Sequence, residues 1–332
     1  MHAALTLARR VVYRAGDAFF PAFADPIWRQ RVLGTVRCLL YHRIGTTGEF
    51  PFLDAWSGAP LEPATLAKDL LFLQRQGAQF LTLADLREGR FPGPREFGVI
   101  VSFDDGTREV YELGLPVLEA HGVRGVVFQI SSLVGSERLL WEHQLYRMWV
   151  DPQRRVRLCQ ALGVKVADAN RKEWNRRLDQ IRQLAPSPKL TDALEHLRSS
   201  IDMDLERALA ERLNPSAEQL RAAVRAGHEV GSHGYLHYMR GSLDEQQFED
   251  ELAYSKRDIE HVLDQPVHSY SHPFNSYLPA DSLVVARHYS QVARVDGLAI
   301  QRNTPPMEIP RINRPGALPN ARRWRRWLWT GG

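Results

Sequence analysis

Short runs rich in β-branched residues, several of them followed by helical patterns, constrain the fold of this sequence most. The runs that predict strands are residues 37–44, 78–83, 98–103, 124–130, 228–233, 266–272 and 290–295. Between them, residues 62–77, 108–122 and 244–263 carry apolar side chains at helical spacing. Because successive parallel strands need helical crossovers, the alternation predicts an α/β fold with a parallel sheet, either open or closed into a barrel.

The alternation stops between about residues 136 and 222, where the chain is rich in Leu, Arg and Ala. We interpret this segment as a helical insertion and not as a separately folding domain. It follows a predicted strand, so we expect it to lie above the carboxyl ends of the strands, where it could shape substrate access.

Composition excludes several classes of protein. The chain has 332 residues, 44% of them hydrophobic and 25% charged, with a net charge of +4, which is ordinary for a globular protein. It carries no signature of a nucleic-acid-binding module, so we predict no nucleic-acid partner. No run reaches the ~20 apolar residues of a membrane span, and the pattern of the first residues does not predict a signal peptide. Cys38 and Cys159 have no disulfide-framework spacing, which favours a reduced, cytoplasmic location.

The last residues, "ARRWRRWLWTGG", interleave Arg322, Arg323, Arg325 and Arg326 with Trp324, Trp327 and Trp329. Arginines alternating with indoles are typical of a segment at a membrane interface, which would make the protein peripheral to the inner membrane. The alternative, which we favour, is a C-terminal helix that packs its tryptophans onto the domain.

Two motifs at predicted strand ends contain candidate catalytic or metal-binding residues. Asp104 and Asp105 follow the apolar run "VIVSF", and His233 and His237 form an HxxxH pair after "EVG". An Asp at a loop start is an ordinary helix N-cap, but capping does not explain two carboxylates. Two histidines on one helical turn would share a face, and a His, His, Asp set suits zinc or a similar divalent ion.

These motifs resemble those of the polysaccharide deacetylases, the carbohydrate esterases with NodB homology. "SFDDG" resembles their first motif, "SHGYLHYMRGSL" their second and "VHSYSHPFN" their third, in the order of the family. "LLYHRI" and "EIPRINRPG" are similar to the entry strand and the closing segment. The resemblance covers roughly residues 37–134 and 220–315.

The resemblance implies a deformed (β/α)7 TIM-like barrel over residues 37–315, interrupted by the insertion at about 136–222. A helical extension (1–36) would precede it and the basic Trp/Arg-rich tail (316–332) would follow. It also implies hydrolytic removal of an acetyl group from an N-acetylated sugar, as in exopolysaccharide biosynthesis, with one divalent metal ion: zinc, or alternatively cobalt or manganese.

Carried over residue by residue, the resemblance assigns Asp105, His233 and His237 as metal ligands and Asp104 as the catalytic base. The backbone N–H of Phe274 would stabilise the oxyanion.

The sequence departs from the family at Gly234, which replaces Ser or Thr, and at Asn275, which replaces Gly but tolerates a left-handed backbone. Ser271 stands where many members carry the Arg that pairs with the base, and we hypothesise that Arg311 supplies this charge.

The general acid stays unassigned, with His42 and His272 as candidates at strand ends. Both are also candidates for substrate binding, together with Tyr235 and the loop-fixing Pro273.

The leading hypothesis is therefore a metal-dependent deacetylase of an N-acetylated glycan, glycolipid or sugar-linked intermediate. The alternatives are a hydrolase of a small non-sugar amide, a glycan-binding protein without turnover, and a membrane-peripheral scaffold that acts through its basic tail.

Overall fold

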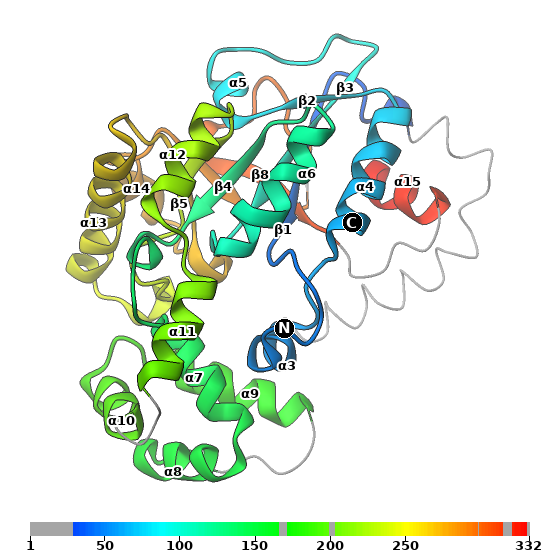
Figure 1. Ribbon diagram of the computed structural model, residues 1–332. Coiled ribbons are helices and arrows are strands. Elements are labelled where there is room, and N and C mark those ends of the chain that lie inside the picture. Colours follow the sequence, from blue (N-terminus) through cyan, green and yellow to red (C-terminus); the bar gives the residue numbers. More distant parts are fainter. Residues whose placement is uncertain (1–28, 166–170, 199–202, 298, 315–320, 331–332) are drawn as a thin grey trace.

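The computed structural model describes residues 29–165, 171–198, 203–297, 299–314 and 321–330. Parallel strands form a closed ring in the order β1-β8-β7-β6-β5-β4-β3, and the pairing of β1 with β3 closes it (Figure 1). β2 and β4 both pair with β3, and β1 pairs along its other side. β2 pairs with residues 97–100 of β3, and β4 pairs with residues 101–103. The strands are β1 (Val36–Tyr41), β2 (Ala78–Leu81), β3 (Phe97–Phe103), β4 (Gly125–Gln129), β5 (Glu229–Ser232), β6 (Ser269–Ser271), β7 (Gln291–Arg294) and β8 (Ile309–Asn313).

The ring confirms the barrel prediction and the seven strands predicted from periodicity. β8 was not among those seven runs. It has only five residues, and Pro310 and Arg311 interrupt its apolar character, so its sequence lacks the pattern of a buried strand.

β3 shows how a strand of the barrel alternates its side chains between two apolar regions. In β3, Ile100 joins a cluster inside the barrel with Cys38 of β1. Its neighbours Val99, Val101 and Phe103 join a second cluster that includes residues of the surrounding helices. Both faces of β3 are buried, which explains why this strand is a nearly continuous apolar run.

Helices cover the outside of the barrel (Figure 1). They are α4 (Pro63–Arg75), α6 (Leu115–Ala120), α12 (Ala217–Arg225), α13 (Glu245–Leu263), α14 (Asp281–Val285) and α15 (Ala321–Thr330). α5 (Leu83–Arg87) instead lies at the amino ends of β5 and β7, and its Leu83 joins the cluster inside the barrel. α4 and α13 lie where the spacing of apolar residues predicts them, and Asp244 and Gln247 form a capping box that begins α13. The third predicted helix is a π-helical turn, Val110–Gly114, that continues into α6, with Pro116 in the first turn of α6.

Between β4 and α12, five helices pack around an apolar cluster of their own, separate from those of the barrel. They are α7 (Trp141–Val150), α8 (Pro152–Leu162), α9 (Arg171–Arg182), α10 (Pro188–Arg198) and α11 (Met203–Leu213). α3 (Pro51–Ser57), from the segment after β1, contacts α7. Figure 1 shows this helical insertion gathered at one end of the barrel, the end where β4 finishes. α12 instead packs on the barrel through Leu220 and Ala223.

The C-terminal helix α15 packs onto the barrel. Trp324, Trp327 and Trp329 are 5%, 5% and 2% exposed, and two of them contact Phe72 of α4 and Phe97 of β3. This is the packed helix favoured over a membrane-interface segment, because buried indoles are not available to a lipid surface.

Within the described ranges, no helix has the length and apolar character needed to cross a membrane. Cys38 and Cys159 are free and buried. The predicted N-terminal extension falls largely on residues 1–28, outside the described residues.

Candidate metal centre

The candidate site lies at the carboxyl ends of the strands, and strand alternation determines which side chains point into it. Cys38 and Ile309 face the barrel interior, and Arg311 lies two residues beyond Ile309 on the same face. By the same alternation Asp104 follows the inward face of β3, and His233 that of β5. Side chains from distant parts of the chain therefore converge above the barrel core.

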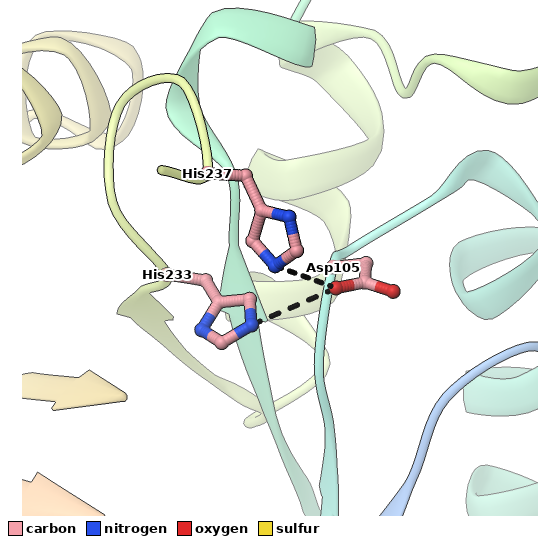
Figure 2. A group of neighbouring side chains, drawn as sticks. All are labelled: Asp105, His233 and His237. Atoms are coloured by element: carbon pink, nitrogen blue, oxygen red, sulfur yellow. Dashed lines mark ion pairs between the residues drawn. The ribbon is translucent and has the colours of Figure 1, made fainter. Parts of the chain in front are cut away.

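Asp105, His233 and His237 form the candidate metal cluster (Figure 2). Oδ1 of Asp105 lies 3.6 Å from Nε2 of His233 and 3.5 Å from Nε2 of His237. One potential ligand atom from each residue lies within 4.8 Å of the others. Two imidazoles and a carboxylate are a donor set that zinc accepts, so the residues fit a divalent ion.

The expectation that HxxxH lies on one helical turn is wrong. His233 follows β5 directly, and His237 lies four residues later in an irregular loop with φ of 60°. The loop folds back so that the two rings lie 4.9 Å apart. Asp105 also has a left-handed backbone, with φ of 68°. Non-glycine residues in this region cost energy and cluster at functional sites.

Gly234 permits this turn. Its φ is +80°, and a Cβ there would lie 3.2 Å from Oε2 of Glu251 and 3.3 Å from Cγ of Pro273. Glu251 of α13 accepts the backbone N–H groups of Tyr235 and Leu236. The side chain of Ser or Thr at position 234 would crowd both neighbours, which explains the departure from the family motif.

Hydrogen bonds set the tautomer of each histidine. Nδ1 of His233 lies 2.8 Å from the backbone oxygen of Ser271, which can only accept, so Nδ1 carries the proton. Nδ1 of His237 lies 2.8 Å from Oε2 of Glu142, a carboxylate whose pKa is lowered to about 2. Burial would raise that pKa, and the charge of Arg182 outweighs it. In its neutral form each histidine therefore presents an Nε2 without a proton toward Asp105.

Asp104 is held by Arg311. Nη1 and Nη2 of Arg311 donate to Oδ1 and Oδ2 at 2.6 and 2.9 Å, and Nη2 also donates to Oγ of Ser271 at 2.6 Å. Asp104 is 4% exposed and Arg311 is 1% exposed. Burial raises the pKa of Asp104, but the charges of Arg311 and His233 hold it below its ordinary value. Arg311 thus lies where the hypothesis requires, with Ser271 as an additional acceptor.

The two candidate general acids have different environments. His272 is 2% exposed, its Nδ1 has no hydrogen-bond partner, and burial lowers its pKa to about 3. Its ring packs among Phe248 and Tyr270. His42 is exposed and follows β1 on the inward face, and its charge acts on Asp104.

The other predicted residues lie around the cluster. The ring of Phe274 lies 4.4 Å from that of His237, and Phe274 and Asn275 have φ of 57° and 51°, so Asn275 has the expected left-handed backbone. Pro273 is buried beside Gly234. The ring of Tyr235 packs on Tyr254 of α13, so its contact with substrate stays a prediction.

Residues 188–290 match the family model described as Polysaccharide deacetylase. The resemblance to the polysaccharide deacetylases is confirmed. The matched range includes His233, His237 and Phe274 but neither Asp104 nor Asp105.

One relative is the "Putative polysaccharide deacetylase YxkH" of Bacillus subtilis, 27% identical over 140 residues, which are 42% of this chain and 45% of that protein. The match thus spans less than half of the relative's length.

Solved structures share the fold of this chain at low sequence identity. The deacetylase PplD of Streptococcus pyogenes aligns with a TM-score of 0.57 and 14% identity, over 89% of this chain and 98% of that one. IcaB of Ammonifex degensii aligns with a TM-score of 0.56 and 17% identity, over 90% and 98%. At these identities the likeness shows the barrel fold and does not identify a substrate.

The sequence alone does not indicate three residues around the cluster: Glu142, which contacts His237, Glu251, which contacts the loop that carries His237, and Arg182, which contacts Glu142 and Phe274. Glu142 is 95 residues from its partner His237 in sequence. No local spacing connects such residues, and Glu142 sits in a segment that reads only as an amphipathic helix.

Proposed function

We propose that this chain is a metal-dependent hydrolase that removes the acetyl group from an N-acetylated sugar of a polysaccharide, glycolipid or sugar-linked intermediate. One observation supports this proposal most directly. A cluster of Asp105, His233 and His237 lies directly beside a second, arginine-paired carboxylate, Asp104. Metal ligation accounts for the cluster but leaves Asp104 without a role, whereas hydrolysis needs a base at that place.

Asp105, His233 and His237 would hold the ion, with zinc the first expectation and cobalt or manganese the alternatives. Bound there, a divalent ion would supply a Lewis acid for the amide carbonyl and lower the pKa of a water molecule.

The residues of the chain account for the proton transfers. Asp104 accepts a proton from the attacking water, whose oxygen forms a bond to the acetyl carbon. Arg311 keeps Asp104 ionised and oriented. The backbone N–H of Phe274 donates to the developing oxyanion. The C–N bond then breaks, and His42 donates a proton to the leaving amine, so the products are acetate and the free amino sugar.

His42 is a better proton donor than His272 for a physical reason. A donor must carry a proton and reach the substrate. Burial lowers the pKa of His272 to about 3, which disfavours its protonated form, whereas the side chain of His42 is exposed where β1 ends.

Acetate release from N-acetylated glycans and sugar nucleotides, with added zinc, cobalt or manganese, tests the proposal. Asp104→Asn should retain zinc binding while turnover falls by about 10²–10⁴-fold, the usual contribution of a general base. Asp105→Asn makes the same change in the adjacent residue, which is a proposed metal ligand, and should weaken zinc binding itself. Equal turnover in wild type and Asp104→Asn would refute the base assignment. Glycan binding without acetate release by wild type would favour a protein without turnover, and release from simple acetamides alone a small-amide hydrolase.

A further inference from the structure

The helical insertion contributes a buried carboxylate to the candidate metal centre. Glu142 lies in the first turn of α7, is 4% exposed, and accepts the Nδ1 hydrogen bond of His237. His233 receives the equivalent support from a backbone oxygen of the barrel. The two histidines of one cluster are therefore oriented by different parts of the chain.

Arg182, the last residue of α9, holds this carboxylate in place. It forms an ion pair with Glu142, donates a hydrogen bond to the hydroxyl of Tyr146, and is 8% exposed. Its guanidinium also stands 4.1 Å from the ring centre of Trp56 and 4.7 Å from that of Phe274. One side chain of the insertion thus contacts both the partner of His237 and the loop after β6.

We propose that Glu142 and Arg182 are positioning residues of the metal centre, so that the insertion is part of the site and not only a cover over it. Glu142 holds His237 in the tautomer that leaves Nε2 free for the ion. Arg182 holds Glu142 against His237 and fixes Phe274 beside it. The inference rests on the proposed function, because it assigns these residues a role toward the same ion.

A purely structural role would predict something different. If Glu142 and Arg182 only filled space between the insertion and the barrel, an isosteric amide at position 142 would leave the metal affinity unchanged. As positioning residues they control the ring of His237, and partners of this kind typically contribute 10–100-fold to metal affinity. Glutamine is the critical change because its amide can donate to Nδ1 as well as accept from it, which allows the wrong tautomer.

The experiment measures Zn²⁺ affinity of the full chain by chelator competition, independent of turnover. We expect about tenfold weaker binding in Glu142→Gln, and up to about 100-fold in Glu142→Ala and Arg182→Met. Nitrogen-15 NMR of the histidine rings should show Nδ1–H of His237 in wild type and a mixture of tautomers in Glu142→Gln. For acetate release at saturating zinc, kcat should fall while KM stays nearly constant.

Asp179→Asn is the matched control. Asp179 is the exposed second partner of Arg182, with 56% of its side chain accessible and a 3.2 Å contact to Nη1. Its loss should leave zinc affinity within about twofold of wild type, as expected for a surface pair. If folded Glu142→Gln and Arg182→Met bind zinc like wild type with His237 in the same tautomer, the inference is overturned. A wild type that binds no divalent ion refutes instead the proposed function on which it rests.

Discussion

The two histidines of the candidate metal centre differ in how the chain supports them. His233 extends the inward face of β5 and donates to a backbone oxygen of β6, so the barrel alone orients it. His237 lies in a loop with a left-handed backbone and donates to a side chain of the insertion. Burial lowers the pKa of His233 to about 4. For His237 the lowering effect of burial is outweighed by Glu142, and its pKa is raised.

The two histidines should differ in how sensitive they are to substitution. The backbone oxygen that binds His233 stays in place whatever side chain its residue carries. The position of His233 therefore depends on the barrel fold and not on one particular side chain. The half supported by the insertion depends on particular side chains, and single substitutions can loosen it. We therefore expect substitutions around His237 to alter metal affinity, and those in the barrel wall to alter stability and turnover.

Arg311→Ala should have the largest effect, because it leaves Asp104 buried and unpaired. Breaking a buried ion pair costs about 3–5 kcal/mol of folding free energy. Without its partner Asp104 also loses its orientation, and turnover should fall by about 10²–10⁴-fold. Urea unfolding and acetate release measure the two effects.

Arg314→Ala is the control for Arg311→Ala. Arg314 follows β8, and its Nε donates to Asp69 at 2.8 Å in another buried pair, away from the cluster. It should lose comparable stability while the folded protein keeps its turnover. If both variants keep wild-type turnover once folded, Arg311 has no catalytic role.

Gly234→Ala should have a smaller effect, confined to the half supported by the insertion. The added Cβ meets Glu251 and Pro273 and must keep a φ of +80°. The left-handed backbone alone costs about 1–2 kcal/mol for alanine. Moving the loop should also displace His237 but not His233, so zinc affinity falls together with stability.

Gly122→Ala separates the two causes. Gly122 has φ of +65°, and a Cβ there would meet no atom within 4 Å. It should show the backbone cost in a urea titration with unchanged zinc affinity. Equal zinc affinity in both alanine variants would mean that the loop geometry does not control the centre.

This contrast also explains how far the sequence predicts the structure. Strand periodicity predicts parallel strands with helical crossovers, and the resemblance to the polysaccharide deacetylases adds their closure into a barrel and the hypothesis for Arg311. The sequence pattern also predicts that Asp104 and His233 follow strand ends. It fails at His237, because a helical turn and an irregular loop are both compatible with HxxxH. Only Gly234 indicates a turn at this place in the sequence. Glu142 and Arg182 could not be predicted, since their contacts depend on how the insertion packs against the barrel.

Glu251, which binds the loop that carries His237, allows a test through pH. Burial raises the pKa of Glu251 to about 7, and the titratable groups that face it are His237, Tyr238, Tyr270 and Tyr289. The folded state therefore binds this proton more tightly than the unfolded chain, whose value is near 4.5. The stability it contributes is fully present below pH 4.5 and is lost as pH rises through about 7.

Glu251→Gln should remove this pH dependence with the smallest structural change. The amide oxygen still accepts the N–H groups of Tyr235 and Leu236, but glutamine does not ionise. Between pH 4.5 and about 7 wild type should lose on the order of 3 kcal/mol that the variant keeps. Urea midpoints from pH 4.5 to 8, in the presence of a chelator, measure it. Parallel curves for the two proteins would mean that Glu251 is ionised in the fold, and that charge, not a neutral acceptor, holds the loop carrying His237.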